Sequence, residues 1–293
     1  MHDNARLVND ALLGRGTPRP IAGVSWLPER LLAELASALP TSDRRLARVV
    51  SDAGLDFAFV PADADWSDSA ARLLNDEGVA VVWAVAGPLW PAIEAHGLGR
   101  AMTLIARRPE TLSEELAGQL DRVQRDVERG LMVDAAAFVL AEELASDRGP
   151  LVPPDYAITQ AIPSLRGAVA LICDAGRAAV FHSDGDTRAL LDSMLYTGFT
   201  ALHVGGGLDR DHADLLGDEV ARRGLTRVGG LPASLLEAGG APAARAAAQL
   251  VAGARAGTVV VADDGGLTSA GGFRTLRRLA DFVRRRAEGS RQA

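Results

Sequence analysis

The sequence predicts a single (β/α)8 TIM barrel, an α/β fold, and three observations carry this prediction. About eight short apolar runs alternate with longer segments of helical period, which is typical of βα units in a parallel sheet. Glycine precedes most of these runs, where a helix commonly ends. The length of 293 residues suits a barrel of ~250 residues with short additions. We therefore expect one domain over 1–293, with its core at roughly 20–287.

Each expected strand is a run rich in Val, Ala, Ile or Phe. The eight runs cover 21–25, 57–60, 80–85, 135–140, 179–182, 201–204, 227–229 and 258–262. Expected helices cover 42–53, about 112–129 and about 273–287, and the Ala-rich stretch 239–256 also predicts a helix. The stretch 87–109 is longer than one loop requires and predicts an extra helix, whereas 145–154 is a Pro-rich βα loop.

An open, doubly wound sheet is the alternative fold. Its dinucleotide-binding form is disfavoured because no G-x-G-x-x-G follows the first expected strand. Gly205-Gly206-Gly207 does follow a strand, but it lacks the Gly-Lys-Ser/Thr ending of a phosphate-binding loop. We interpret this run as a tight turn of a barrel.

The composition excludes several classes of function. The net charge of −7 gives no general attraction to nucleic acids or anionic membranes. The single cysteine, Cys173, excludes an intrachain disulfide and a thiolate-rich zinc site, and its place on an apolar helix face predicts burial. No stretch approaches the ~20 apolar residues of a membrane span, and residues 1–20 contain no signal-peptide core. We expect a cytoplasmic protein with no nucleic-acid or membrane partner.

The absence of lysine is equally informative, since all 31 basic residues are arginine. Arginine stays protonated and cannot form an imine with a carbonyl compound. The sequence therefore excludes lysine-dependent aldolases and enzymes that hold pyridoxal phosphate as a Schiff base.

Polar side chains at the carboxyl ends of the strands are the candidate site residues, because a barrel carries its active site there. A ring of carboxylates with one or two histidines suits proton transfer, or metal binding through nitrogen and oxygen. Other roles stay open: carboxylates such as Asp184 and Asp186 could cap the next helix, and His203 could point into the barrel wall. The strand-end residues are Trp26, Asp63, Glu142, Glu143, His182, Asp184, His203, Asp263 and Asp264.

Several stretches, in this order along the chain, resemble the uroporphyrinogen decarboxylase superfamily. They are Leu27-Pro-Glu29, Leu55-Asp56 through Asp63, Pro109-Glu110, Ala141-Glu-Glu-Leu-Ala-Ser146 with Gly149-Pro-Leu-Val-Pro153 and Tyr156, Pro163-Ser-Leu165, Val180-Phe-His-Ser-Asp-Gly185, and Ala201-Leu-His203. The resemblance covers roughly 20–286 and implies that Asp63 takes the place of the catalytic aspartate. With the strand-end pattern, it leads us to expect catalytic roles for Asp63, His182 and Asp184. Substrate contacts are expected from Trp26, Glu142, Glu143, Tyr156, His203 and Asp264.

The chain departs from both main branches of that superfamily. The arginine pair with which the decarboxylases hold their substrate has no counterpart in the stretch 22–26, and their C-terminal Gly-His-Gly is Asp263-Asp-Gly-Gly266 here. The corrinoid-dependent methyltransferases carry a zinc-binding His-x-Cys pattern, which reads His182-Ser183-Asp184 here. His182 and Asp184 could still bind a divalent metal such as zinc, or act as acid and base without one.

Three functions follow from this comparison. The first is a methyltransferase acting on a small molecule, with a corrinoid carried by a partner protein. The second is a tetrapyrrole decarboxylase that holds its substrate with relocated arginines, such as Arg30, Arg148 or Arg188. The third is a non-catalytic ligand-binding or partner protein on the same scaffold. A homodimer is compatible with each of them.

Overall fold

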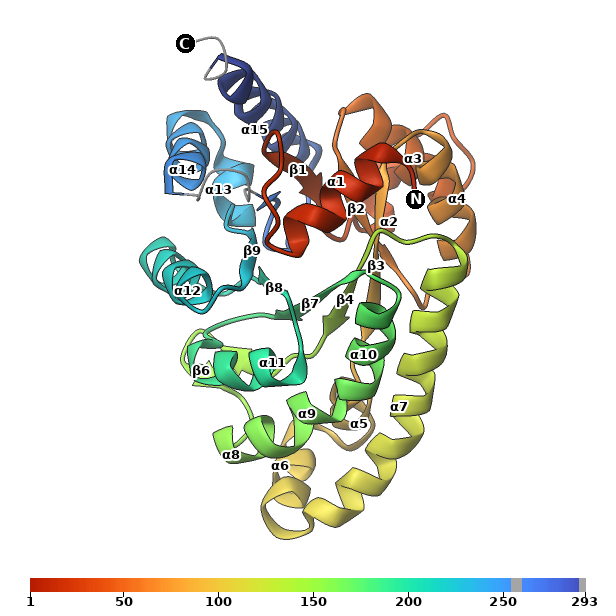
Figure 1. Cartoon of the computed structure of the whole chain (residues 1–293), viewed down its shortest axis with the longest axis vertical. Helices are drawn as coiled ribbons and strands as arrows, with labels where there is room; N and C mark the ends of the chain where they lie inside the picture. The colour runs from red at the N-terminus through yellow and green to blue at the C-terminus, as the bar shows by residue number, and fades with distance from the viewer. Residues whose placement is uncertain (254–259, 290–293) are drawn as a thin grey trace.

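Eight parallel strands close into a barrel in the computed structural model, which describes residues 1–253 and 260–289 (Figure 1). The order around the barrel follows the chain, and the last strand pairs with the first, which closes the sheet. This confirms the predicted (β/α)8 fold and excludes the open sheet. The strands are β1 (Ile21–Val24), β2 (Phe57–Pro61), β3 (Ala80–Ala86), β4 (Ala137–Ala141), β7 (Ala178–Ser183), β8 (Ala201–Val204), β9 (Thr226–Gly229) and β10 (Val260–Val261).

The observed strands lie within two residues of the predicted ones at nearly every end. For the last strand, residues 258–259 of the predicted run lie outside the described residues. The Pro-rich loop after β4 contains a small antiparallel pair, β5 (Ala145–Ser146) and β6 (Gly149–Pro150). This pair follows the β4 end directly and therefore lies beside the candidate site.

Helices surround the barrel (Figure 1). The predicted extra helix between β3 and β4 is present as two helices, followed by one long helix. The Ala-rich stretch is helical up to residue 253, and 254–256 lie outside the described residues. The helices after β1 are α2 (Glu29–Leu35), α3 (Ser42–Asp52), α4 (Ser67–Asp76), α5 (Leu89–His96), α6 (Leu98–Arg107), α7 (Pro109–Met132), α8 (Pro154–Tyr156), α9 (Ile162–Ser164), α10 (Arg166–Asp174), α11 (Leu191–Thr197), α12 (Arg210–Arg222), α13 (Ala233–Ala238), α14 (Gly240–Gly253) and α15 (Ala270–Gly289), with a π-helical turn at Ala157–Ala161 and a 3-10 turn at Arg188–Leu190.

A helix that the sequence pattern did not predict, α1 (Asp3–Leu12), closes the amino-terminal end of the barrel. Its residues Val8 and Leu12 are fully buried and belong to the same apolar cluster as the inward-facing Phe57. Asn9 completes the seal: its amide donates to the Gly176 carbonyl at 2.9 Å and accepts from the Ala178 N–H at 2.8 Å. The carboxyl ends of the strands are therefore the end at which a site can form.

Side chains alternate between the barrel interior and the surrounding helices, as the period of a strand requires. On β4, Ala137 and Val139 face the interior, while Phe138 and Leu140 pack against the helices. The interior is filled mainly by small residues and by the rings of Phe57 and Phe59. This alternation continues past the strand ends and decides which polar residues reach the site.

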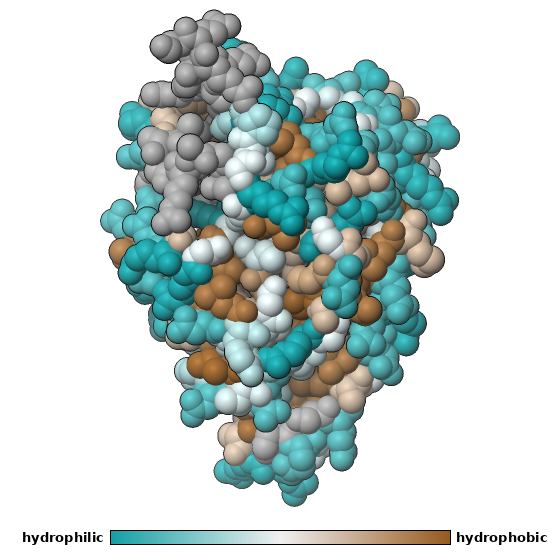
Figure 2. Space-filling view, viewed as in Figure 1, coloured by the Kyte–Doolittle hydropathy of each residue, from teal (hydrophilic) through white to brown (hydrophobic). Residues whose placement is uncertain are grey.

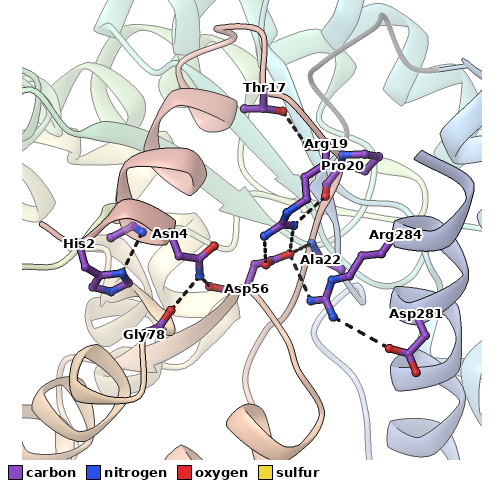
Figure 3. A network of polar contacts seen from close by, with 11 residues as sticks. His2, Asn4, Thr17, Arg19, Pro20, Ala22, Asp56, Gly78, Asp281 and Arg284 are labelled. Carbon is purple, nitrogen blue, oxygen red and sulfur yellow. Dashed lines mark hydrogen bonds and ion pairs between the residues drawn. The ribbon is translucent and has the colours of Figure 1, made fainter. Parts of the chain in front are cut away.

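A buried ion network holds the amino-terminal side of the barrel together (Figure 3). Asp56, at the start of β2, receives two hydrogen bonds from Arg19, at 2.6 and 2.9 Å, and one from the Ala22 N–H at 2.9 Å. Arg284 of α15 lies 3.4 Å from the same carboxylate. The network thus joins the segment before β1, the β2 strand and the last helix, on the face opposite the candidate site.

On the face drawn in Figure 2, hydrophilic residues cover most of the periphery and hydrophobic residues are exposed between them, mainly towards the middle. Cys173 of α10 is exposed, so the prediction that it is buried is wrong: it faces away from its buried neighbour Ile172. Within residues 1–253 and 260–289, no single helix is long and apolar enough to cross a membrane. One bent pair, 154–164 with Arg166–Asp174, passes that test of length and composition only when its two halves are taken together.

Candidate active site

Three side chains of the kinds that can bind a metal meet at the carboxyl ends of β4 and β7. The His182 Nε2 lies 3.4 Å from the Glu143 Oε1 and 3.9 Å from the Asp184 Oδ1. One donor atom from each residue lies within 4.8 Å of the other two. The register explains the meeting: Ala141 pairs with His182, and Glu143 follows Ala141 by two residues on the same inward face.

A second histidine lies behind this group. His203 of β8 pairs with His182 across the sheet, and their Nδ1 atoms are 2.8 Å apart. The His203 Nε2 lies 2.9 Å from the Asp263 carbonyl oxygen. Burial and, to a smaller extent, the charge of His182 lower the pKa of His203 to about 3. His203 therefore points into the barrel interior as a neutral side chain, and the alternative of a wall-facing histidine is excluded.

The two carboxylates of the group have opposite pKa shifts. Burial raises the pKa of Glu143, but hydrogen bonding to His182, the charge of His182 and the Asp184 N–H together lower it below the ordinary value. Burial and the nearby charge of Glu143 raise the pKa of Asp184, although His182 and a 2.7 Å hydrogen bond from the Gly206 N–H oppose this rise. Glu143 is thus the more persistent anion of the pair.

Two adjacent aspartates after β10 have different roles. Asp263 is fully buried and receives hydrogen bonds from the Ser25 N–H (2.8 Å), the Ser25 hydroxyl (2.5 Å) and the Gly265 N–H (3.1 Å), so it links the end of β10 to β1. Burial raises its pKa. Asp264 is half-buried and accepts from the Ala233 N–H at 2.9 Å. Burial, and then the charges of Asp263 and Asp184, raise the pKa of Asp264 to about 6.

Aromatic rings form the apolar side of the site. The Trp26 ring lies 4.7 Å from the His182 ring and 5.8 Å from the His203 ring, centroid to centroid. Phe59 lies 5.0 Å from Trp26 and 5.1 Å from His203. These contacts hold both imidazoles in place and exclude water from their inner faces.

Two predicted substrate contacts lie apart from the His182 group. Glu142 is fully buried on the outer side of β4, where its carboxylate accepts from the Leu89 N–H at 2.8 Å. Burial raises the pKa of Glu142 to about 8. Tyr156 is buried nearby, and burial together with the charge of Glu142 raises its pKa to about 12. Both residues face the helices instead of the barrel interior.

Asp63, the expected catalytic aspartate, is exposed in the turn after β2. Within the described part of the chain, no hydrogen bond or ion pair joins it to His182, Glu143 or Asp184. Asp184 does not cap α11, whose N-cap is Leu190, but Asp186 accepts from the Arg188 N–H at 3.1 Å, at the start of the 3-10 turn that leads into α11. Asp186 also forms an ion pair with Arg188.

The three relocated arginines of the decarboxylase alternative are either held by another residue or exposed. Arg188 is held by Asp186 in a forked pair, with N–O distances of 2.6–3.1 Å. Arg30 donates to the Thr268 carbonyl at 3.3 Å, and Arg148 is exposed beside the β5–β6 pair. As far as residues 1–253 and 260–289 show, none of the three forms an ion pair with the Glu143, His182 and Asp184 group.

Sequence reasoning found the three central residues through the strand-end rule but missed their supports. Ser25 anchors Asp263, and the Gly206 N–H orients Asp184. Gly206 lies in a glycine run that the sequence showed, but its role depends on a contact between two loops. The donor set of one imidazole nitrogen and two carboxylate oxygens suits zinc and other divalent transition metals.

Comparison with known proteins gives no match to a family model and no match to a curated protein sequence. Solved structures do match. A methyltransferase from Methanosarcina mazei has a TM-score of 0.70 at 15% identity, over 96% of this chain and 99% of that chain. A B12-independent methionine synthase from Shewanella sp. W3-18-1 has a TM-score of 0.57 at 12% identity, over 90% of this chain and 92% of that one.

A third structure, 3-keto-D-glucoside 4-epimerase from E. coli, has a TM-score of 0.55 at 13% identity, over 91% of this chain and 100% of that chain. At these identities the likeness shows the fold alone. The chain therefore shares a barrel with methyltransferases and with enzymes of other activities.

Proposed function

We propose that this barrel is a metal-dependent methyltransferase that acts on a small molecule at the carboxyl end of its strands. One observation carries the proposal: Glu143, His182 and Asp184 each place a donor atom within 4.8 Å of the other two. The position agrees with the rule that barrels bind and react at this end. Methyltransferase and methionine synthase structures among the similar folds support the reaction type.

Glu143, His182 and Asp184 are the residues that would hold the metal, and their donor set fits it. A bound divalent metal supplies Lewis acidity that makes a coordinated thiol or hydroxyl a nucleophile near neutral pH. The Gly206 N–H orients Asp184, and the Trp26 ring excludes water beside His182. Asp264, with a pKa of about 6, accepts the proton that the nucleophile releases.

The finer assignment follows from the resemblance to the uroporphyrinogen decarboxylase superfamily. We propose membership of its methyltransferase-like branch, with the methyl group delivered by a corrinoid on a partner protein. The missing cysteine of the His-x-Cys pattern is replaced in this proposal by Asp184, and Glu143 supplies the third ligand. The decarboxylase alternative is weakened because Arg188, one of its candidate arginines, is already neutralised by Asp186.

The first test is the metal content of the untagged protein, purified without added metal and measured by mass spectrometry. We expect about one transition metal per chain, lost in His182→Ala and in Glu143→Gln. His212→Ala is the matched control, because His212 is exposed and hydrogen-bonds to Asp209, the N-cap of its own helix α12. No metal in the wild-type protein, even after dialysis against zinc, would contradict the proposal.

The second test separates the three functions. Methylcobalamin is mixed with a panel of small thiols and alcohols, and the loss of its methyl–cobalt absorbance is followed with wild-type protein and with His182→Ala. Transfer that requires His182 supports the methyltransferase. Loss of CO₂ from uroporphyrinogen instead would support the decarboxylase, and metal binding without turnover of either would support a binding protein.

A further inference from the structure

We propose that His203 is a positioning residue: it fixes a proton on the Nδ1 of His182 and so turns the Nε2 lone pair toward Glu143 and Asp184. The inference rests on the proposed function, because it treats that group as a cation site. It adds a residue that touches neither the cation nor the substrate.

The backbone behind His203 fixes which of its ring nitrogens carries the hydrogen. The His203 Nε2 lies 2.9 Å from the Asp263 carbonyl oxygen, which can only accept a hydrogen bond. The Nε2 must therefore carry the hydrogen. The ring is fully buried against Phe59 and Trp26, where a second proton would place an unpaired charge among aromatic side chains. His203 is neutral, and its Nδ1 is an acceptor.

The contact between the rings of His203 and His182 fixes the tautomer of His182. The Nδ1 atoms of His203 and His182 are 2.8 Å apart, a distance that requires one hydrogen between them. Because the Nδ1 of His203 is an acceptor, His182 supplies that hydrogen. The opposite tautomer of His182 would place two lone pairs against each other at this distance. His203 thus excludes the tautomer of His182 that carries its single proton on Nε2.

The other ring nitrogen of His182, Nε2, faces the carboxylates of Glu143 and Asp184. With the proton held on Nδ1, the Nε2 of a neutral ring presents a lone pair to the Glu143 Oε1 at 3.4 Å and the Asp184 Oδ1 at 3.9 Å. A lone pair facing two carboxylate oxygens is stabilised only by a cation between them, either a metal ion or a proton. Without a metal, a proton on Nε2 allows His182 to donate the hydrogen bond, and to supply the charge, that lower the pKa of Glu143. The chain from Asp263 through His203 to His182 therefore prepares a site for a cation.

The test compares two substitutions of His203. His203→Phe keeps a buried ring but removes the acceptor and the donor. His203→Gln keeps both, since an amide carries a carbonyl oxygen and an N–H group. Phe57→Leu is the packing control: it shortens a fully buried ring of the same barrel interior that has a ring contact with Phe59 but with neither histidine.

Two readouts are used on the full chain. The first is long-range ¹H–¹⁵N NMR of the metal-free protein labelled at its 5 histidines, which shows which nitrogen of His182 carries a proton. The second is zinc affinity, measured by competition with a chromophoric chelator. We expect a protonated Nδ1 in the wild type and a 10–100-fold loss of zinc affinity in His203→Phe. His203→Gln and Phe57→Leu should stay within a few-fold of the wild type.

The outcomes distinguish this inference from the proposed function. An unprotonated Nδ1 on His182 in the wild type overturns the inference, as does equal zinc affinity in wild type and His203→Phe. If the wild type binds no zinc, the proposed function fails. The NMR result then decides the inference alone, which stands if Nδ1 is protonated in the wild type and loses this preference in His203→Phe but not in His203→Gln.

Discussion

Glu142 and Glu143 are adjacent in sequence but have opposite surroundings. Glu143 faces the barrel interior and lies beside His182, which stabilises its anion. Glu142 faces the helices, fully buried, and accepts a hydrogen bond from the Leu89 N–H. Desolvation penalises the charged form and outweighs the opposing charge of Arg122, so the neutral acid is favoured. The strand alternation alone therefore gives two neighbouring carboxyl groups different charge states near neutral pH.

Glu142→Gln is expected to remove part of the pH dependence of stability. The pKa of Glu142 rises from 4.5 to about 8 in the folded protein, so the folded state binds the proton more tightly than the unfolded state. Its stabilising contribution is complete below pH 4.5 and is lost as pH rises through 8. Between these values the wild type should lose up to about 1.4 kcal/mol per pH unit relative to Glu142→Gln.

Urea unfolding at pH 5, 6, 7 and 8 measures this difference. Glu94→Gln is the control, since it makes the same chemical change on an exposed side chain of neighbouring α5, where Glu94 accepts from the Trp90 indole. The free energy of unfolding of Glu94→Gln should change with pH in the same way as that of the wild type. Parallel profiles for the wild type and Glu142→Gln would show that Glu142 is ionised in the folded protein, contrary to this prediction.

At the scale of elements, the glycine run after β8 is shaped by the site. A Cβ on Gly205 would lie 2.3 Å from the Asp184 Oδ1 and 2.8 Å from the Ser183 carbonyl oxygen. The neighbouring Gly206 has only ordinary contacts for a Cβ, the nearest at 3.8 Å. The first glycine is thus required by the close approach of the loops after β7 and β8.

Gly205→Ala is expected to weaken zinc binding by at least tenfold, because the new methyl group displaces Asp184 from its place beside His182. Gly206→Ala should change the affinity by no more than a few-fold. Both variants should keep their circular dichroism spectrum. Equal affinities for the two, measured by the same chelator competition, would mean that Asp184 is not a ligand.

The elements themselves were largely predictable, since strands and helices follow local hydrophobic period and glycine stops. The helix α1 was not, because its apolar face is buried only against the barrel end, a contact between distant parts of the chain. The strand-end rule found Glu143, His182 and Asp184. It could not separate Glu142 from Glu143, since the inward phase of β4 depends on its pairing with β3 and β7.

At the scale of the whole molecule, the Asp56 network ties the first strands to the last helix. Asp56→Ala leaves Arg19, Arg284 and the Ala22 N–H without their buried partner. We expect a loss of about 3 kcal/mol in the free energy of unfolding, in the range found when one partner of a buried pair is removed. The site lies at the other end of the barrel, so zinc affinity should be unchanged below the unfolding transition.

The control for this prediction is Asp52→Ala, which removes an exposed pair with Arg48 within α3. It should cost no more than about 0.5 kcal/mol. Urea unfolding at one pH compares the two. If Asp56→Ala costs no more than Asp52→Ala, the network does not stabilise the barrel.

The closure of the amino-terminal end by α1 determines from which side small molecules reach the site. Val8 and Leu12 fill the amino-terminal end of the barrel, so the described residues leave the carboxyl ends of the strands as the side from which His182 can be approached. In a transfer reaction the group donor and the acceptor must then both enter from the carboxyl end of the barrel, either side by side or one after the other. A bulky donor bound at this end would block the exit of a smaller acceptor bound deeper in the barrel. The order in which the two bind would then set the rate.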